Sequence, residues 1–194
     1  TAAAQLADEV DLHVVFRPYQ LDPTASPGKS QPVVEAYAKK FGGPERAAQI
    51  IDHVTTIAAA EGLEFRMDRA LRANTLLAHR LLWLAEATGD QYALKERLMR
   101  AYFCEGLDIG DIDTLATCAH DVGMARDGVR DFLRSDDGSA EVQALLQVAA
   151  EAEITAVPTF VFDGRWMVPG AQDPETFVNV VRQLLAKNLE TTDV

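Results

Sequence analysis

The fold is decided by the stretch TAVPTFVFDGRWMVPG, residues 155–170. Thr159–Phe162 has the composition of a β-strand, and Asp163-Gly164 is a strong two-residue hairpin turn. The chain returns over residues 165–168, and Pro169-Gly170 ends this second run because proline cannot donate a ladder hydrogen bond. The stretch therefore predicts a β-hairpin.

A final helix is predicted after the hairpin, from Pro174 to about Leu189. Its inner face carries apolar residues at helical spacing, namely Phe177, Val181, Leu184 and Leu185. We expect the hairpin to pack on this helix through Phe162, Trp166 and Met167. The acidic tail, Glu190 to Val194, is expected to be frayed.

The centre of the chain, from Pro32 to about Ala152, is almost wholly helical in pattern, with prolines at helix starts and glycines after helix ends. The pattern predicts a bundle of helices joined by short loops. The helical runs cover residues 32–41, 44–61, 74–89, 90–106, 111–122, 126–133 and 140–152.

Before this block, residues 11–16 alternate, with Leu12, Val14 and Phe16 on one face, which predicts a strand. Residues 24–32 have the composition of a loop. Residues 1–9 look like the end of a helix, and the chain does not begin with Met. We therefore expect a preceding segment, whose strand would complete a βαβ unit with this helix.

The charge balance excludes some classes of partner. The chain has 194 residues, with 18 Lys+Arg against 30 Asp+Glu, for a net charge of −12. Sequence-independent nucleic-acid binding and anionic membrane surfaces both require a basic face. No apolar run approaches the ~20 residues of a membrane span. The two cysteines, Cys104 and Cys118, are too few for a disulfide scaffold and form no Cys-x-x-Cys pair.

Several segments, in order over nearly the whole chain, resemble the DsbA family of thioredoxin-fold proteins, and more narrowly its FrnE-like branch. Towards the end of the chain they are TAVPTFVFDG (155–164), VPGAQ (168–172) and PETF (174–177). Upstream they are RPYQLDP (17–23), GLEF (62–65), ANT (73–75), AHR (78–80), AYF (101–103) and GLDIG (106–110).

The resemblance implies an α/β, thioredoxin-like fold with a large all-helical insertion domain. Residues 1–30 and 153–190 would form the thioredoxin-like part, residues 31–152 the insertion and residues 191–194 a tail. It also implies a Cys-x-x-Cys active site facing a cis-proline loop, with Pro158 as the cis-proline and Val157 before it. Local sequence alone favours a trans bond at Pro158. Since this chain has no Cys-x-x-Cys, we expect the catalytic pair upstream of Thr1.

Six residues are candidates for substrate binding. Val157, Pro158 and Thr159 would bind an extended substrate as an added strand. Asn74 is first a helix N-cap, although the resemblance places it near the ligand cleft. His79 and Arg17 could line the cleft, with a structural role favoured for both. The scattered His13, His53 and His120 lack metal-ligand spacing, so no metal site is expected.

Three functions remain open. The leading one is thiol–disulfide exchange on a protein or small-molecule substrate, with no cofactor except glutathione as a substrate or redox partner. The second is a glutathione-dependent isomerase or transferase of the 2-hydroxychromene-2-carboxylate isomerase or kappa type, which uses serine in place of the first cysteine. The third is a redox-inactive peptide-binding module. No nucleic-acid or membrane partner is expected, a homodimer is left open, and the family branch suggests the cytoplasm.

Overall fold

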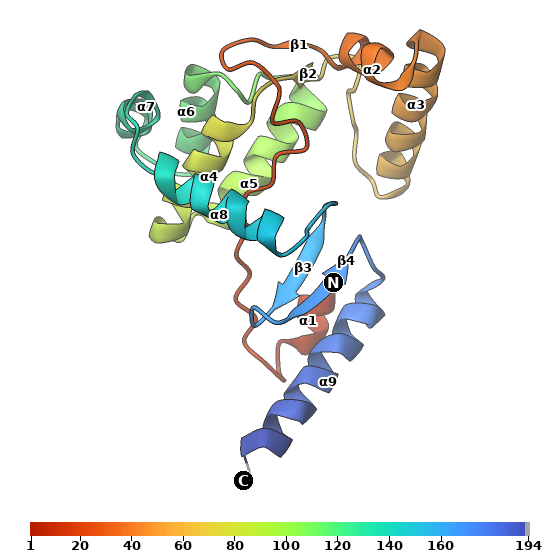
Figure 1. The fold of residues 1–194 in the computed structure, drawn as a ribbon, viewed down its shortest axis with the longest axis vertical. Coiled ribbons are helices and arrows are strands. Elements are labelled where there is room, and N and C mark those ends of the chain that lie inside the picture. Colours follow the sequence, from red (N-terminus) through yellow and green to blue (C-terminus); the bar gives the residue numbers. More distant parts are fainter. Residues whose placement is uncertain (193–194) are drawn as a thin grey trace. The chain divides into compact units, whose positions relative to one another are not determined.

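The computed structural model describes the backbone of residues 1–192 and the side chains up to residue 187 (Figure 1). The chain forms two compact units. Unit 1 contains Thr1–Val14 and Ala149–Val194, and unit 2 contains Val15–Val148. The domain boundaries expected after residues 30 and 152 remain predictions. They divide a thioredoxin-like part from an insertion, whereas the two units are defined by contacts between residues. None of the described helices has the length and hydropathy needed to span a bilayer.

Unit 1 is built around the predicted hairpin. Strands β3 (Thr159–Phe162) and β4 (Trp166–Pro169) pair antiparallel, with Phe162 opposite Trp166. The flanking helices are α1 (Ala2–Leu6) and α9 (Pro174–Thr192). Its core consists of the buried Leu6, Val178 and Val181, with the half-buried Phe162 and Leu185 packed against them. The predicted hairpin and final helix are thus confirmed. The helix continues into the predicted tail, whose last two residues lie outside the described part.

The strand predicted over residues 11–16 is wrong, because these residues take no part in either sheet of the described chain. Leu12 packs against the core of unit 1, whereas Phe16 contacts the ring of Tyr92 in unit 2. Val14, between them, is 57% exposed. The alternation therefore does not mark one buried face. The chain passes here from one unit to the other, and alternation alone cannot supply the hydrogen-bonding partner that a strand requires.

The predicted packing of the hairpin on the last helix is correct for Phe162 and wrong for Met167. Met167 is 52% exposed because its neighbour across the ladder is Val161, on the face opposite to Phe162. Trp166 is 46% exposed, and the Lys187 ammonium group lies 4.8 Å from its ring centroid. Trp166 thus contacts the last helix on the same face as Phe162, whereas the opposite face, with Val161 47% and Met167 52% exposed, is largely open to solvent.

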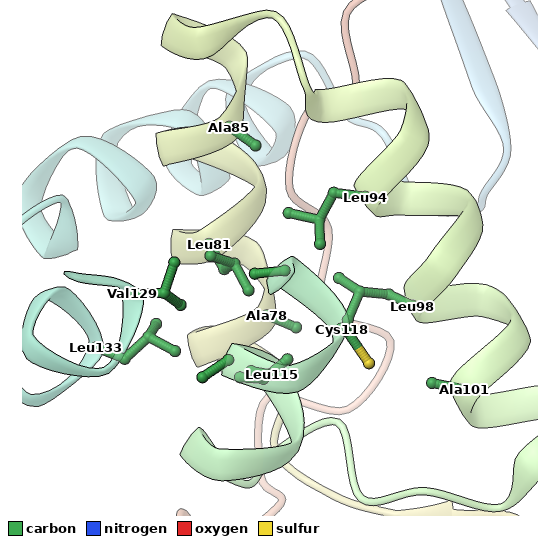
Figure 2. Close-up of a cluster of buried hydrophobic side chains, with 12 residues drawn as sticks. Ala78, Leu81, Ala85, Leu94, Leu98, Ala101, Leu115, Cys118, Val129 and Leu133 are labelled. Atoms are coloured by element: carbon green, nitrogen blue, oxygen red, sulfur yellow. The ribbon is translucent and has the colours of Figure 1, made fainter. Parts of the chain in front are cut away.

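Unit 2 contains the predicted helices, with ends within two residues of the predicted ones except at the C-terminal end of the helix that begins at Gln91. They are α2 (Val33–Phe41), α3 (Pro44–Ala60), α4 (Leu76–Thr88), α5 (Gln91–Arg100), α6 (Ile112–Asp121), α7 (Arg126–Arg134) and α8 (Ser139–Glu151). The last residues of α8, from Ala149, belong to unit 1. Figure 2 shows the main core, where Leu81 of α4, Leu94 of α5, Leu115 of α6 and Leu133 of α7 meet.

Two local features were not predicted. A two-residue bridge pairs β1 (Gln31–Pro32) with β2 (Leu71–Arg72). The helix expected to run to about residue 106 changes after α5 into a π-helical turn, η1 (Ala101–Glu105). It ends at Gly106, which has φ +69, and a Cβ there would lie 2.6 Å from the Cβ of Arg69. This close approach accounts for a glycine at that position.

Candidate functional site

The loop before β3 presents Val157 and Pro158 at the surface of unit 1. The peptide bond between them is cis. The Gly170 N–H donates a hydrogen bond of 2.8 Å to the Pro158 carbonyl, and the Thr159 hydroxyl donates one of 2.8 Å to the Ala156 carbonyl. The polar group of Thr159 is thus engaged within the loop. Val157 is 43% exposed, so its side chain is free to contact another molecule.

A cavity of about 320 Å³ opens beside this loop, on unit 1 alone. Its lining residues come from the loop after α8 and from the hairpin, and they are Glu153, Ile154, Thr155, Ala156, Thr159, Met167 and Pro169. Its walls are mainly apolar, with one carboxylate at Glu153. A cavity of this size accommodates an amino-acid side chain or a small ligand.

The other three candidate residues lie in unit 2, and each is engaged within the protein. Arg17 forms an ion pair of 2.7 Å with Glu86 of α4. The Asn74 amide donates to the Ala25 carbonyl at 2.7 Å, and its oxygen accepts from the Leu76 N–H at 2.9 Å.

Thr75 occupies the N-cap position of α4, but no side-chain capping bond comes from it. Instead, the side-chain oxygen of Asn74 accepts a hydrogen bond from the Leu76 N–H, which is otherwise free at the start of α4.

His79 lies on α4 and donates a hydrogen bond to the Tyr19 backbone carbonyl. Burial lowers the pKa of His79, and the bond to Tyr19 opposes this shift in part. The imidazole is therefore neutral at pH 7. In this state it holds the backbone near Tyr19 against α4.

These contacts belong to a larger set that fixes residues 16–25, which we call the 16–25 segment. Gln91 of α5 clamps Phe16, since its oxygen accepts from the Phe16 N–H at 2.9 Å and its nitrogen donates to the Phe16 carbonyl at 3.1 Å. Arg72 donates to the Asp22 carboxylate at 2.7 Å. Hydrogen bonds from the Thr24 hydroxyl and from Arg72 lower the pKa of Asp22. Side chains of unit 2 thus hold an irregular segment.

Sequence reasoning missed Gln91 and Arg72. Gln91 is 6% exposed, yet in the sequence it looks like an ordinary polar residue in the first turn of a helix. The partners of these side chains lie 75 and 50 residues away. No local pattern signals such contacts.

Neither cysteine is placed for disulfide chemistry. Both are free, with Cys104 half-buried in η1 and Cys118 buried in the core between α5 and α6 (Figure 2). Burial raises the pKa of the Cys118 thiol, although the nearby Arg97 opposes this shift. Since the thiolate is the nucleophile, Cys118 is chemically inert. Among the described side chains, no group of three or more His, Cys, Asp or Glu residues could hold a metal ion.

The chain matches a protein family, a related protein and solved structures. The DSBA-like thioredoxin domain matches residues 1–182. The uncharacterized protein YwbO of Bacillus subtilis is 29% identical over 166 residues, which are 84% of this chain and 73% of that protein.

Two solved structures are also similar. The structure of a probable DsbA oxidoreductase from Streptomyces coelicolor is 32% identical, with a TM-score of 0.80, and the match covers 88% of this chain and 74% of that chain. A structure from Nitrosomonas europaea is 18% identical, with a TM-score of 0.60 over 82% of this chain and 89% of that chain, and shows the fold alone.

Proposed function

Because the chain belongs to the DSBA-like thioredoxin domain family, we propose that it is a thiol–disulfide oxidoreductase whose substrates bind at the Val157-Pro158 loop. The expected α/β thioredoxin-like fold with a helical insertion is confirmed by the family match and by the Streptomyces structure. The observation that carries the proposal is this match over residues 1–182. The exposed loop before β3 offers a site for the substrate.

The reaction requires a pair of thiols that Cys104 and Cys118 do not provide. We propose that a Cys-x-x-Cys pair outside these 194 residues supplies them. The first thiolate attacks one sulfur of a substrate disulfide, so that a mixed disulfide forms and one substrate thiolate leaves. The second thiolate then attacks the mixed disulfide and releases the other substrate thiolate. The protein dithiol loses two electrons and two protons as it becomes a disulfide, and the substrate disulfide takes up both as it becomes two thiols.

Within this proposal the two sets of candidate residues have different roles. Val157 is exposed in the loop before β3, so an extended substrate could pair with the backbone there as an added strand. Arg17, Asn74 and His79 act as positioning residues, because Arg17 ties the 16–25 segment to Glu86 of α4, and Asn74 and His79 bind backbone carbonyls of that segment. The FrnE-like branch, the cytoplasmic location, the homodimer and the absence of a cofactor remain predictions.

The proposal is tested on the protein expressed from its complete reading frame. Thiols are counted after equilibration with dithiothreitol and with oxidised glutathione, and reduction of a fluorescent disulfide peptide is followed. We expect a dithiol that the two reagents interconvert and that reduces the peptide. If no such dithiol exists, the oxidoreductase function is refuted. Tight glutathione binding by calorimetry together with a serine at the first cysteine position would favour the isomerase or transferase instead.

A further inference from the structure

The residue at the rim of the unit 1 cavity, Glu153, occupies an unfavourable backbone position. It follows the C-terminal end of α8 and has φ +55, in the left-handed region where glycine is preferred. The Glu153 N–H donates to the Ala150 carbonyl at 3.0 Å, and the Ile154 N–H donates to the Ala149 carbonyl at 3.0 Å. This is the helix-ending motif that most commonly carries glycine.

The charge of Glu153 is also unfavourable at this place. The C-terminal end of a helix carries partial negative charge, which repels a carboxylate. No basic residue lies in the last turn of α8. Among the described residues that line the cavity, Glu153 is the charged one, and the remainder are apolar apart from two threonines. A glycine here would remove both the strain and the repulsion, which suggests that the carboxylate serves another purpose.

We propose that Glu153 is a specificity residue that selects substrates with a basic residue beside an apolar one near their reactive cysteine. The inference rests on the proposed function and adds the substrate class. A polypeptide lying along Val157 would place an apolar side chain in the cavity, against Ile154 and Met167. A lysine or arginine next to it would meet the Glu153 carboxylate at the rim.

The sign of the surrounding charge agrees with this substrate class. The chain carries a net charge of −12, so an acidic peptide is repelled by the whole protein and by Glu153. A basic peptide is attracted by both. Because the general attraction does not depend on one carboxylate, the test must separate it from the local effect of Glu153.

The test measures binding of fluorescein-labelled decapeptides to the protein expressed from its complete reading frame, by anisotropy. The peptides carry an S-methylated cysteine and a leucine, and they differ in one flanking residue, which is Lys, Ala or Glu. We expect the Lys peptide to bind about three- to fivefold tighter than the Ala peptide at low salt. The Glu153→Gln variant should lose most of this preference. The Glu151→Gln variant is the matched control, since it removes the same charge from the same helix end at a residue that does not line the cavity.

A further variant, Glu153→Gly, separates the specificity role from a structural one. It should raise the Tm by about 1–4 °C, because glycine accepts the left-handed conformation, while it removes the preference for the Lys peptide. Equal affinities for the three peptides, or a preference that survives in Glu153→Gln, would overturn the inference. The two proposals can fail independently. If the complete protein prefers the Lys peptide but reduces no disulfide peptide, the oxidoreductase function is refuted while the role of Glu153 stands.

Discussion

Arg80 is a buried cation that ties α4 to the end of α7, and replacing it by methionine tests this connection. Its side chain is 4% exposed. The guanidinium donates to the carbonyl oxygens of Phe132, Ser135 and Asp137, at 3.0, 2.8 and 2.7 Å. These carbonyls lie at and just beyond the C-terminal end of α7, where helix carbonyls carry partial negative charge. These carbonyl oxygens therefore stabilise the positive charge of Arg80, which pairs with no carboxylate among the described contacts.

The expected cost of Arg80→Met follows from these bonds. A hydrogen bond to a charged group contributes about 1.5–3 kcal/mol, so three good bonds together exceed about 4 kcal/mol. Removal of the cation also removes its desolvation cost, which is several kcal/mol. The carbonyls of Ser135 and Asp137 are left without this donor, at about 1–3 kcal/mol each, so we expect Arg80→Met to lower the free energy of unfolding by about 2–5 kcal/mol. Arg80→Lys keeps the charge but loses the planar five-donor fork, so we expect a loss of about 1–3 kcal/mol.

The assay is urea unfolding followed by the fluorescence of Trp83, whose ring stacks 6.4 Å from that of Phe132. A Trp166→Phe background removes the signal of the other tryptophan. Arg134→Met is the control, because this arginine is exposed on the last turn of α7, whose end Arg80 binds. The free energy of unfolding of this variant should change by less than about 0.5 kcal/mol. A loss below about 1 kcal/mol in Arg80→Met, or no loss in Arg80→Lys, would refute the reasoning.

Two further predictions concern the side chains that hold the 16–25 segment. Burial lowers the pKa of His79 below the value of about 6.5 in the unfolded chain, so the unfolded state binds more protons in this range. The free energy of unfolding should therefore fall as the pH decreases from about 6.5 to the folded-state pKa. Urea midpoints measured between pH 5 and 8 should depend less on pH in His79→Gln than in the unmodified protein. Identical pH profiles of the two proteins would contradict this prediction. Gln91→Leu leaves the Phe16 N–H and carbonyl without their partner, so we expect a loss of about 1–3 kcal/mol and faster hydrogen exchange at the Phe16 amide. An unchanged exchange rate would show that the clamp is unimportant.

The elements that could be predicted from the sequence are those with local signals. The Asp163-Gly164 turn and the proline and glycine residues at helix ends depend on backbone preferences that act within a few residues. The hairpin and the helices of both units accordingly agree with the prediction. The strand over residues 11–16 failed because a strand depends on a partner elsewhere in the chain. The β1–β2 bridge was missed for the same reason, since its two members lie about 40 residues apart.

The candidate site was less accessible from the sequence. Val157 and Pro158 stand out by their place before a strand, and the structure places them in an exposed loop. The clamp at Gln91 has no such signal, because a glutamine in the first turn of a helix is usually exposed. Glu153 was also missed, since its significance lies in a left-handed backbone conformation and in a cavity that the hairpin helps to form.

The hydrogen bonds already made by a side chain decide whether it can bind a substrate directly. Asn74 and His79 both donate to carbonyls of the 16–25 segment, so a ligand would have to replace these bonds rather than add to them. Such an exchange has little net effect on free energy, because one hydrogen bond is lost for each one gained. Val157 has no such commitment, and burial of its exposed side chain by a ligand is a net gain. Substitutions at Asn74 and His79 should therefore act on binding through the order of the 16–25 segment, whereas substitutions at Val157 act on it directly.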